Sequence, residues 1–209
     1  MDRMFFRNLA REVKEVWLDV DGVMTRQGDL AIYDVGTPDH PAFERKDGVQ
    51  SFRFVTCDEH GMPEKEVVEY LAGFVGEPIM EGYRFDTRDG RMIERAVKAG
   101  FPVHFVSGRN SPCVLKRAIN LGARPLLGEK DKVVTIERES LAGWDHILFI
   151  GDGVQDVGAL ERAYISVAPA DASSEAIAVA KFVTAARGGE GVVDEVLRMF
   201  FEARKVSLD

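Results

Sequence analysis

Residues 16–25 read VWLDVDGVMT, and this stretch decides how the rest of the chain is interpreted. The apolar run Val16–Leu18 stops abruptly at Asp19, which is the pattern of a short buried strand. A second carboxylate, Asp21, follows closely, and Gly22 permits a sharp turn after it. Two acids at the end of a buried strand repel each other unless a cation lies between them, so the stretch is a candidate metal site.

Carboxylate oxygens are hard ligands, and they favour Mg²⁺ over Zn²⁺ at such a site. Taken alone, the stretch has an alternative interpretation as a strand-ending turn with two solvated aspartates, because Asp and Gly are ordinary turn residues. A zinc site elsewhere is disfavoured. Cys57 and His60 are spaced C-x-x-H, but no second pair has ligand spacing, and His104 lies inside an apolar run that predicts a packed core residue.

The same pattern of an apolar run followed by small polar residues occurs twice more. Val103–Val106 leads into Ser107-Gly108-Arg109, and Ile147–Ile150 leads into Gly151-Asp152-Gly153. Weaker strand candidates are residues 125–127, 165–168 and 182–184. Helical spacing of apolar residues is found over 90–99, 111–121, 130–141, 154–162 and 191–203, and a short amphipathic helix or loose arm is expected before Lys14.

Strands that alternate with helices predict an α/β fold with three layers, in which a mostly parallel, Rossmann-like central sheet is covered by helices on both faces. In such sheets the ligand site lies beyond the carboxyl ends of the strands. Asp19, Ser107 and Asp152 each follow a predicted strand, so we expect all three at one edge of the sheet.

Residues 26–85 interrupt this alternation with several prolines and many glycines. Strand-like pieces occur at Leu30–Val35 and Ser51–Thr56, and a helix is expected over Glu64–Phe74. A structureless loop of this length would be unusual in a compact domain. The chain is therefore predicted to be a single domain, residues 1–209, with a cap-like element or extended hairpin inserted after the first strand.

Groups that suit a phosphate follow in the middle of the chain. Ser107, with Gly108 and Arg109, offers a hydroxyl and backbone N–H groups at a helix start, which favour anions, although Ser107 could equally be a simple helix N-cap. Lys130 and Lys132 precede the next apolar helix, and either ammonium could neutralise a phosphate oxygen. The sequence leaves open which of the two lysines does so.

A second acidic cluster, GDGVQD, occupies residues 151–156. Asp152 could complete a metal site with Asp19 and Asp21, and Asp156 could brace that site or cap the following helix. Arg88, Asp89 and Arg109 each flank a motif and, with Gly108, are candidate substrate contacts. Their alternative role is helix capping at the surface.

Composition bears on whether the protein binds nucleic acid or a membrane and on the compartment in which it works. The net charge of −8 and the pI near 5.1 argue against a broad nucleic-acid surface. Two cysteines without a CxxC pair favour a reduced, cytoplasmic setting. No apolar run approaches the length of a membrane span, so neither nucleic acid nor a membrane is expected as a partner.

Taken together, DVDGVMT at 19–25, VSGR at 106–109, Lys132 and GDGVQD at 151–156 resemble the haloacid dehalogenase-like (HAD) superfamily of phosphotransferases. FDTRDG at 85–90, Leu121-Gly122 and GGEG at 188–191 are similar to the cap-less phosphatases of KDO 8-phosphate and of N-acylneuraminate 9-phosphate. Two features depart from that group. Residues 26–85 replace a short hairpin, and Val192-Val193-Asp194-Glu195 stands where an Arg-Glu pair is frequent.

The resemblance implies a Mg²⁺-dependent phosphatase that hydrolyses a small phosphorylated metabolite, an acidic sugar phosphate, through an aspartyl-phosphate intermediate. Asp19 would be the nucleophile and Asp21 the general acid and base, while Ser107 and Lys132 would hold the phosphoryl group. Mg²⁺ would be bound by Asp19, Asp152 and the backbone carbonyl of Asp21, with Asp156 supporting these ligands.

The resemblance also implies a homo-oligomer, with a tetramer as the expected assembly. Two alternatives stay open at this point. One is a phosphatase or phosphomutase of the same fold for another substrate, with residues 26–85 acting as a cap that sets specificity. The other is a catalytically silent regulatory or binding subunit, which the intact set of acids, serine and lysine disfavours.

Overall fold

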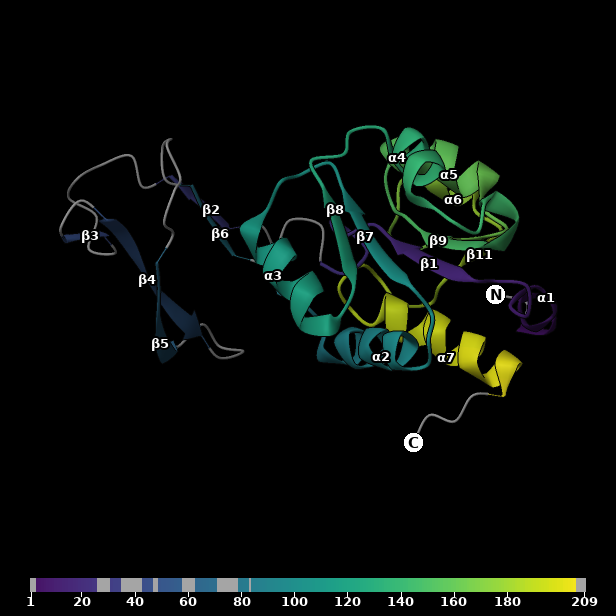
Figure 1. Cartoon of the computed structure of the whole chain (residues 1–209), viewed down its shortest axis with the longest axis horizontal. Coiled ribbons are helices and arrows are strands. Elements are labelled where there is room, and N and C mark those ends of the chain that lie inside the picture. Colours follow the sequence, from purple (N-terminus) through teal and green to yellow (C-terminus); the bar gives the residue numbers. More distant parts are fainter. Residues whose placement is uncertain are drawn as a thin grey trace. The chain divides into compact units, whose positions relative to one another are not determined.

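The computed structural model of the chain describes residues 3–25, 31–34, 43–46, 49–57, 63–70, 79–82 and 84–205. The chain divides into two compact units, one formed by residues 1–30 together with 83–209 and the other by residues 31–82 (Figure 1). The smaller unit falls within the predicted insertion 26–85. No helix in the described ranges is long and apolar enough to cross a membrane.

The larger unit is built on a six-stranded sheet with the order β11-β10-β9-β1-β7-β8, and all neighbouring strands are parallel. The strands are β1 (Glu15–Leu18), β7 (Val103–Ser107), β8 (Arg124–Leu127), β9 (Ile147–Ile150), β10 (Ile165–Ala168) and β11 (Phe182–Val183). Each corresponds to an apolar run predicted as a strand, because a parallel strand covered on both faces is apolar throughout. The strand before Asp19 therefore lies inside the sheet, between β9 and β7.

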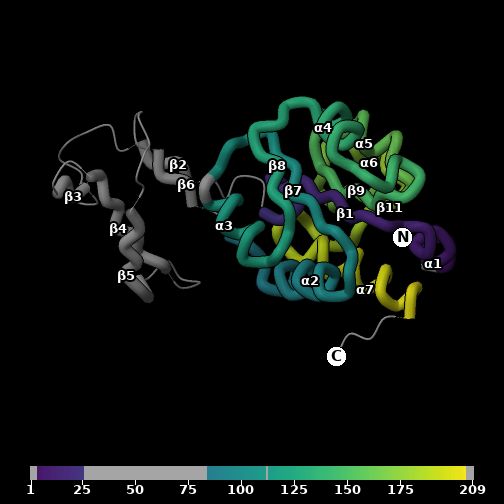
Figure 2. Tube along the Cα trace, viewed as in Figure 1, coloured from purple at the N-terminus to yellow at the C-terminus, as the bar shows by residue number. Residues whose placement is uncertain are grey.

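Helices cover both faces of this sheet, which confirms the predicted three-layer α/β fold (Figures 1 and 2). One layer contains α1 (Arg3–Leu9), α2 (Thr87–Lys98), α3 (Pro112–Leu121) and α7 (Val192–Arg204). The other contains α4 (Lys132–Glu139), α5 (Val157–Arg162) and α6 (Ser174–Val179). Two short 3₁₀ turns, Trp144–His146 and Val154–Asp156, precede β9 and α5.

One helix, α6, is missed by the sequence analysis. It has only six residues, too few for a periodic apolar pattern to stand out. A local cap stabilises it, because the Ser173 side chain accepts a hydrogen bond from the Ala176 amide at 3.2 Å. The helix is thus specified more by its N-cap than by an apolar face.

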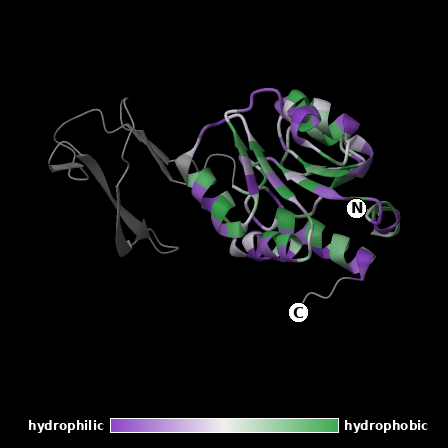
Figure 3. Cartoon of the chain, viewed as in Figure 1, coloured by the Kyte–Doolittle hydropathy of each residue, from purple (hydrophilic) through white to green (hydrophobic). Residues whose placement is uncertain are grey.

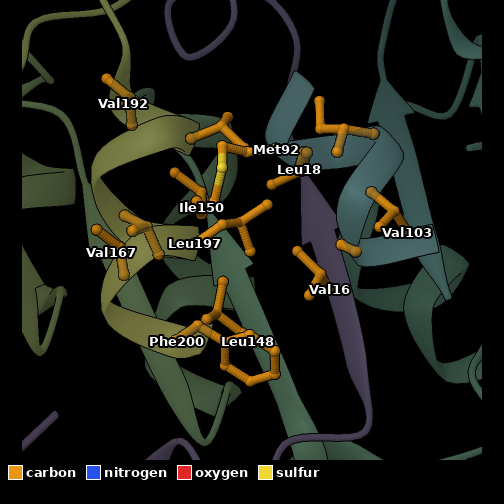
Figure 4. Packing of buried hydrophobic residues seen from close by; sticks show 14 of the residues in the cluster. Val16, Leu18, Met92, Val103, Leu148, Ile150, Val167, Val192, Leu197 and Phe200 are labelled. Carbon is orange, nitrogen blue, oxygen red and sulfur yellow. The ribbon is translucent and has the colours of Figure 1, made fainter. Parts of the chain in front are cut away.

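Side chains of the central strand β1 point alternately into the two hydrophobic clusters, one on each face of the sheet. Val16 and Leu18 point into the cluster under α2 and α7, where Leu197 and Phe200 pack against them (Figure 4). Trp17 points to the opposite face, into the cluster under α4 and α5. Successive side chains of a strand face opposite sides of the sheet, so one strand contributes to both cores. Figure 3 shows the same arrangement, with hydrophobic strands between helices of mixed character.

Two buried polar side chains lie near the start of β1. His104 is 6% exposed and its ring stacks on Trp17 at a centroid distance of 4.1 Å, which confirms that it is a packed core residue. Glu15 is 5% exposed and its carboxylate accepts hydrogen bonds from Trp17 Nε1, Ser140 Oγ and the Leu141 amide. Glu15 therefore ties the loop after α4 to the start of the central strand.

Glu15→Gln is expected to lower the free energy of unfolding at pH 7 by about 2 kcal/mol, because the amide nitrogen would face a donor that the carboxylate now accepts from. Burial by itself raises the pKa of Glu15, but hydrogen bonds from Ser140, Trp17 and Leu141 outweigh it and hold the pKa below its usual value. The ionised carboxylate thus stabilises the fold above the unfolded-state pKa, and this contribution disappears as the pH falls through the folded-state pKa.

Urea unfolding of both proteins at neutral and acidic pH measures this effect. The difference between wild type and Glu15→Gln should shrink as the pH falls below about 4. An equal difference at both pH values would show that the charge of Glu15 contributes nothing.

The smaller unit contains two antiparallel pieces. A three-stranded sheet is formed by β3 (Phe43–Lys46), β4 (Val49–Cys57) and β5 (Pro63–Tyr70). A separate ladder joins β2 (Ala31–Asp34) to β6 (Ile79–Gly82), with Ala31 opposite Gly82. The excursion of the chain into this unit therefore begins and ends at the same ladder. The predicted strands near 30–35 and 51–56 correspond to β2 and β4, and residues 30 and 35 lie outside the described residues.

The helix predicted over Glu64–Phe74 is wrong where the structure describes it, because Pro63–Tyr70 forms β5. This strand pairs with β4 along nearly its whole length, with Phe54 opposite Val67 and Arg53 opposite Val68. Adjacent β-branched residues fit such a ladder, and the pairing outweighs the helix propensity of the neighbouring glutamates and lysine. Residues 71–74 lie outside the described residues.

Candidate active site

The carboxyl ends of β1, β7 and β9 bring the predicted site residues to one edge of the sheet. Leu18 is in register with Phe105 of β7 and with Ile150 of β9, and the Asp19 amide donates to the Ile150 carbonyl at 2.9 Å. Asp19, Ser107 and Asp152 each stand at or just past the end of one of these strands. The sheet topology thus explains why residues far apart in the sequence meet here.

Three carboxylates form a buried cluster at this edge. Asp19, Asp152 and Asp156 each offer one oxygen, and these oxygens all lie within 4.8 Å of one another. The three residues are 2%, 6% and 0% exposed. Burial raises the pKa of Asp19 well above its usual value, and the negative charges of Asp156 and Asp152 add to the rise although Lys132 opposes it. Beside Asp156 and Asp152, the ionised form of Asp19 is therefore disfavoured even though Lys132 lies next to it.

A divalent cation fits these residues. A bound cation would favour the ionised form of these buried carboxylates, and an all-oxygen donor set suits Mg²⁺. The turn after Asp21 also lets the Asp152 carboxylate lie directly against the backbone. Gly22 has φ +78°, and a Cβ there would lie 2.0 Å from Asp152 Oδ2. The C-x-x-H pair considered for zinc includes His60, which lies outside the described residues.

Lys132 is the lysine of the site. Its side chain is buried, and Nζ lies 2.7 Å from Asp19 Oδ2 and also pairs with Asp156 Oδ1. Burial lowers the pKa of Lys132, but the adjacent Asp19 and Asp156 carboxylates outweigh it and raise the pKa, so the ammonium stays charged. Lys130 is exposed. Of the two lysines, Lys132 is the one that lies in the carboxylate cluster, at the start of α4, where Asp131 caps the helix by accepting from the Val133 and Val134 amides.

Asp156 organises the turn that carries Asp152. Its Oδ2 accepts hydrogen bonds from the Asp152 and Gly153 amides, each at 3.0 Å, while Oδ1 pairs with Lys132. Both oxygens are thus engaged within the protein. This arrangement matches a supporting role for Asp156 better than a direct place among the metal ligands.

The Ser107 loop forms the next part of the site edge. Ser107 is 1% exposed, and its Oγ accepts from the Arg109 amide at 3.1 Å. Two backbone hydrogen bonds, from Gly128 to the Arg109 carbonyl and from Glu129 to the Ser107 carbonyl, fix the loop against the start of the α4 segment. Ser107 is not the N-cap of α3, since Ser111 has that role.

Asp21 and Arg109 lie further out than the buried cluster. Arg109 Nε is 3.6 Å from Asp21 Oδ2, and their side chains are 47% and 34% exposed. Asp21 is therefore partly exposed to solvent, which fits the general acid and base that the resemblance implies. Its place beside Arg109 was not evident from the sequence, which put the two residues in separate motifs.

A cavity of about 640 Å³ is lined by Arg84, Phe85, Asp86, Thr87, Arg88, Gly189 and Glu190. Arg88 reaches it with a guanidinium that is held by the Asp86 carboxylate and that donates to the Glu190 carbonyl at 2.9 Å. The cavity wall is connected to the acidic turn, because a Cβ on Gly188 would lie 2.1 Å from the Gly22 carbonyl oxygen. The Asp89 side chain does not line the cavity; it is buried and accepts from the Asp194 amide.

Sequence reasoning missed two of these contributors. Asp86 holds Arg88 and caps α2 by accepting from the Arg88 amide, a role that its position before a predicted helix could have revealed. The contact between Gly188 and Gly22 has no comparable signal. A glycine pair is visible in the sequence, but the backbone that it approaches is not.

Comparisons with known proteins agree with this geometry. A family model described as haloacid dehalogenase-like hydrolase matches residues 136–196. The chain is 29% identical over 159 residues to the 3-deoxy-D-manno-octulosonate 8-phosphate phosphatase of Yersinia pestis, covering 74% of this chain and 82% of that protein. It is 31% identical over 125 residues to the phosphatase of the same name from Escherichia coli K12, and spans 66% of its length.

Solved structures are similar over nearly the whole chain. A probable YrbI-family phosphatase from Pseudomonas syringae has a TM-score of 0.68 at 24% identity, with 97% of this chain and 93% of that chain covered. The 3-deoxy-D-manno-octulosonate 8-phosphate phosphatase of Moraxella catarrhalis, solved with magnesium, phosphate and KDO, has a TM-score of 0.66 at 21% identity, with 95% and 91% covered. At these identities the likeness shows the fold.

Proposed function

Because the chain belongs to the haloacid dehalogenase-like superfamily and is a phosphatase, we propose that it uses Mg²⁺ to hydrolyse a small acidic sugar phosphate through an aspartyl-phosphate on Asp19. The observation that supports this most strongly is the buried cluster of Asp19, Asp152 and Asp156 with Lys132 at the end of β1. A surface of solvated turns would have no reason to bury these four charges together.

Asp19 and Asp152 would hold the metal, together with the backbone carbonyl of Asp21, while Asp156 keeps the Asp152 turn in place. When bound, Mg²⁺ supplies the positive charge that lets a carboxylate approach a phosphate dianion. Asp19 must be ionised to attack, and Lys132 at 2.7 Å favours the ionised form.

The reaction proceeds in two steps. In the first, an Asp19 carboxylate oxygen attacks phosphorus, the bond to the leaving sugar oxygen breaks, and Asp21 gives its proton to that oxygen. In the second, Asp21, now deprotonated, takes a proton from water as the water oxygen attacks phosphorus and the bond to Asp19 breaks. Phosphate leaves with Asp19 and Asp21 restored. Lys132 and the Ser107 hydroxyl would neutralise and position the phosphoryl oxygens in both steps.

The substrate class rests on the relatives and on the charge around the site. Two relatives are named for 3-deoxy-D-manno-octulosonate 8-phosphate, which carries a carboxylate as well as a phosphate. Arg84, Arg88 and Arg109 are exposed here, and exposed arginines suit an acidic ligand. The tetramer and the cytoplasmic location implied by the sequence remain predictions, and a mass measurement in solution tests the first.

Removal of metal tests the activity. Phosphate release from a generic aryl phosphate should be lost in EDTA and recovered when Mg²⁺ is added in excess, because the carboxylate cluster lacks the charge to bind a phosphate alone. A panel of sugar phosphates then tests the substrate class, and acidic sugar phosphates should show a higher kcat/KM than their neutral counterparts. No release from any member of either set would point to the catalytically silent alternative.

A further inference from the structure

Helix α7 begins without a side-chain cap of its own. Its N-cap residue is Gly191, which has φ +97° and no side chain that could accept from the first amides of the helix. The first N–H groups of a helix have no partner within it, and a buried one must find an acceptor elsewhere. The helix N-terminus therefore depends on another segment of the chain.

Asp89, in the first turn of α2, supplies that acceptor. Its Oδ1 accepts from the Asp194 amide at 2.8 Å across 105 positions of sequence. Asp194 is the third residue of α7, which is the amide that a local N-cap side chain would bind. Asp89 is 1% exposed, and this burial raises the pKa of its carboxyl to about 7, so the cap depends on the oxygen acceptor rather than on a full negative charge. The carboxylate thus acts as a cap provided by a neighbouring helix.

Arg88 holds the other side of the same turn. Its guanidinium donates to the Glu190 carbonyl at 2.9 Å, and a Cβ on Gly191 would lie 3.0 Å from that guanidinium. Two consecutive residues of α2 therefore bind the backbone on either side of Gly191: Arg88 at Glu190 and Asp89 at Asp194. The start of α2 fixes where the chain leaves the glycine-rich segment and enters α7.

The glycine-rich segment lies directly against the turn that follows Asp21. The Gly189 amide donates to the Val23 carbonyl at 3.0 Å, and Gly188 packs so closely on Gly22 that only glycine fits. Gly189 and Glu190 also form part of the cavity wall. A displacement of this segment would move both the wall of the cavity and the support of the Asp21 turn.

We propose that Asp89 is a positioning residue of the active site, which caps α7 and thereby holds residues 188–190 against the turn carrying Asp21. Asp89 reaches the reaction only through this segment, because it neither lines the cavity nor belongs to the carboxylate cluster. Its effect on rate rests on the proposed phosphatase function, but its effect on the segment does not.

Asp89→Ala and Asp89→Asn test the assignment. Alanine removes the acceptor, and Asp89→Ala should lower kcat/KM by about tenfold or more at a temperature where the variant is folded, since loss of alignment away from the reacting atoms can cost up to about 10² in rate. Asparagine keeps an oxygen acceptor of the same shape, so Asp89→Asn should recover most of that loss.

Ser140→Ala is the matched control. It removes a partly buried hydrogen bond to Glu15 at the opposite end of β1, so it should lower the melting temperature while kcat/KM stays at the wild-type value. If Asp89→Ala and Ser140→Ala lose similar stability and both keep wild-type kcat/KM, Asp89 is merely structural and the proposal is overturned.

Hydrogen exchange gives a readout that needs no activity. In Asp89→Ala the Gly189 and Asp194 amides should exchange about tenfold faster or more, because both bonds depend on the position of the segment. Asp89→Asn should protect them as wild type does, and it serves alone if the alanine variant does not fold. Unchanged exchange at Gly189 in Asp89→Ala contradicts the proposal even if wild type proves to have no phosphatase activity, while that inactivity would contradict the proposed function alone.

Discussion

Asp19→Asn is expected to abolish phosphate release while the chain stays folded. The amide has the shape of the carboxylate and keeps the Oδ1 acceptor that receives the Val20 amide at 2.7 Å. Its nitrogen then faces Lys132 Nζ in place of Oδ2, so the variant should be less stable by about 2 kcal/mol but still folded. The amide cannot form an aspartyl-phosphate, and the loss should exceed about 10⁴-fold. This is more than the 10²–10³ typical of one transition-state contact and is in the range found for removal of a nucleophile.

A Mg²⁺-dependent phosphate assay, with a circular dichroism melt of the same sample, measures both parts of this result. Asp145→Asn is the control, because it makes the same chemical change at an exposed position and should keep the wild-type rate. Turnover by Asp19→Asn within about tenfold of wild type would remove Asp19 from the role of nucleophile.

Lys132→Met is expected to reduce kcat by about 10²–10³-fold and to make stability depend strongly on Mg²⁺. Methionine fills similar volume but leaves Asp19 and Asp156 buried without their cation. Breaking such a buried pair costs about 3–5 kcal/mol, and a divalent ion bound to the remaining carboxylates would recover part of it. The melting temperature of the variant should therefore rise more with added Mg²⁺ than that of wild type.

Lys130→Met provides the comparison for this variant. The same substitution, two positions earlier on an exposed side chain, should change neither the rate nor the dependence of the melting temperature on Mg²⁺. Equal behaviour of the two variants would mean that the buried ammonium has no special part in the reaction.

The inner strands of the central sheet, such as β1 and β9, were predictable because they are buried on both faces. Val16–Leu18 and Ile147–Ile150 are apolar at every position, and each ends at the residue where the site begins. The same rule fails outside the sheet. Pro63–Tyr70 belongs to a ladder whose partner strand sets its conformation, and such a partner cannot be read from the eight residues themselves.

The site residues were predictable in part for the same reason. Asp19, Ser107 and Asp152 follow apolar strands, so topology alone brings them to one edge. The choice of Lys132 over Lys130 depends on where α4 starts, which Asp131 determines by capping. The hydrogen bond from the Asp194 amide to Asp89 depends on how α2 packs beside α7, and no local sequence pattern predicts that contact.

The ladder between β2 and β6 makes the smaller unit a replaceable module. Ala31 and Gly82 stand opposite each other, so the chain enters the segment with β3, β4 and β5 from one strand of an antiparallel pair and leaves it into the other. Changing the length of β3, β4 or β5 should leave the register of β1 against β7 and β9 untouched, because none of these three described strands pairs with the central sheet. Descendants of such a chain can diverge in size at this junction, and a designer can graft there, while the catalytic framework keeps its geometry.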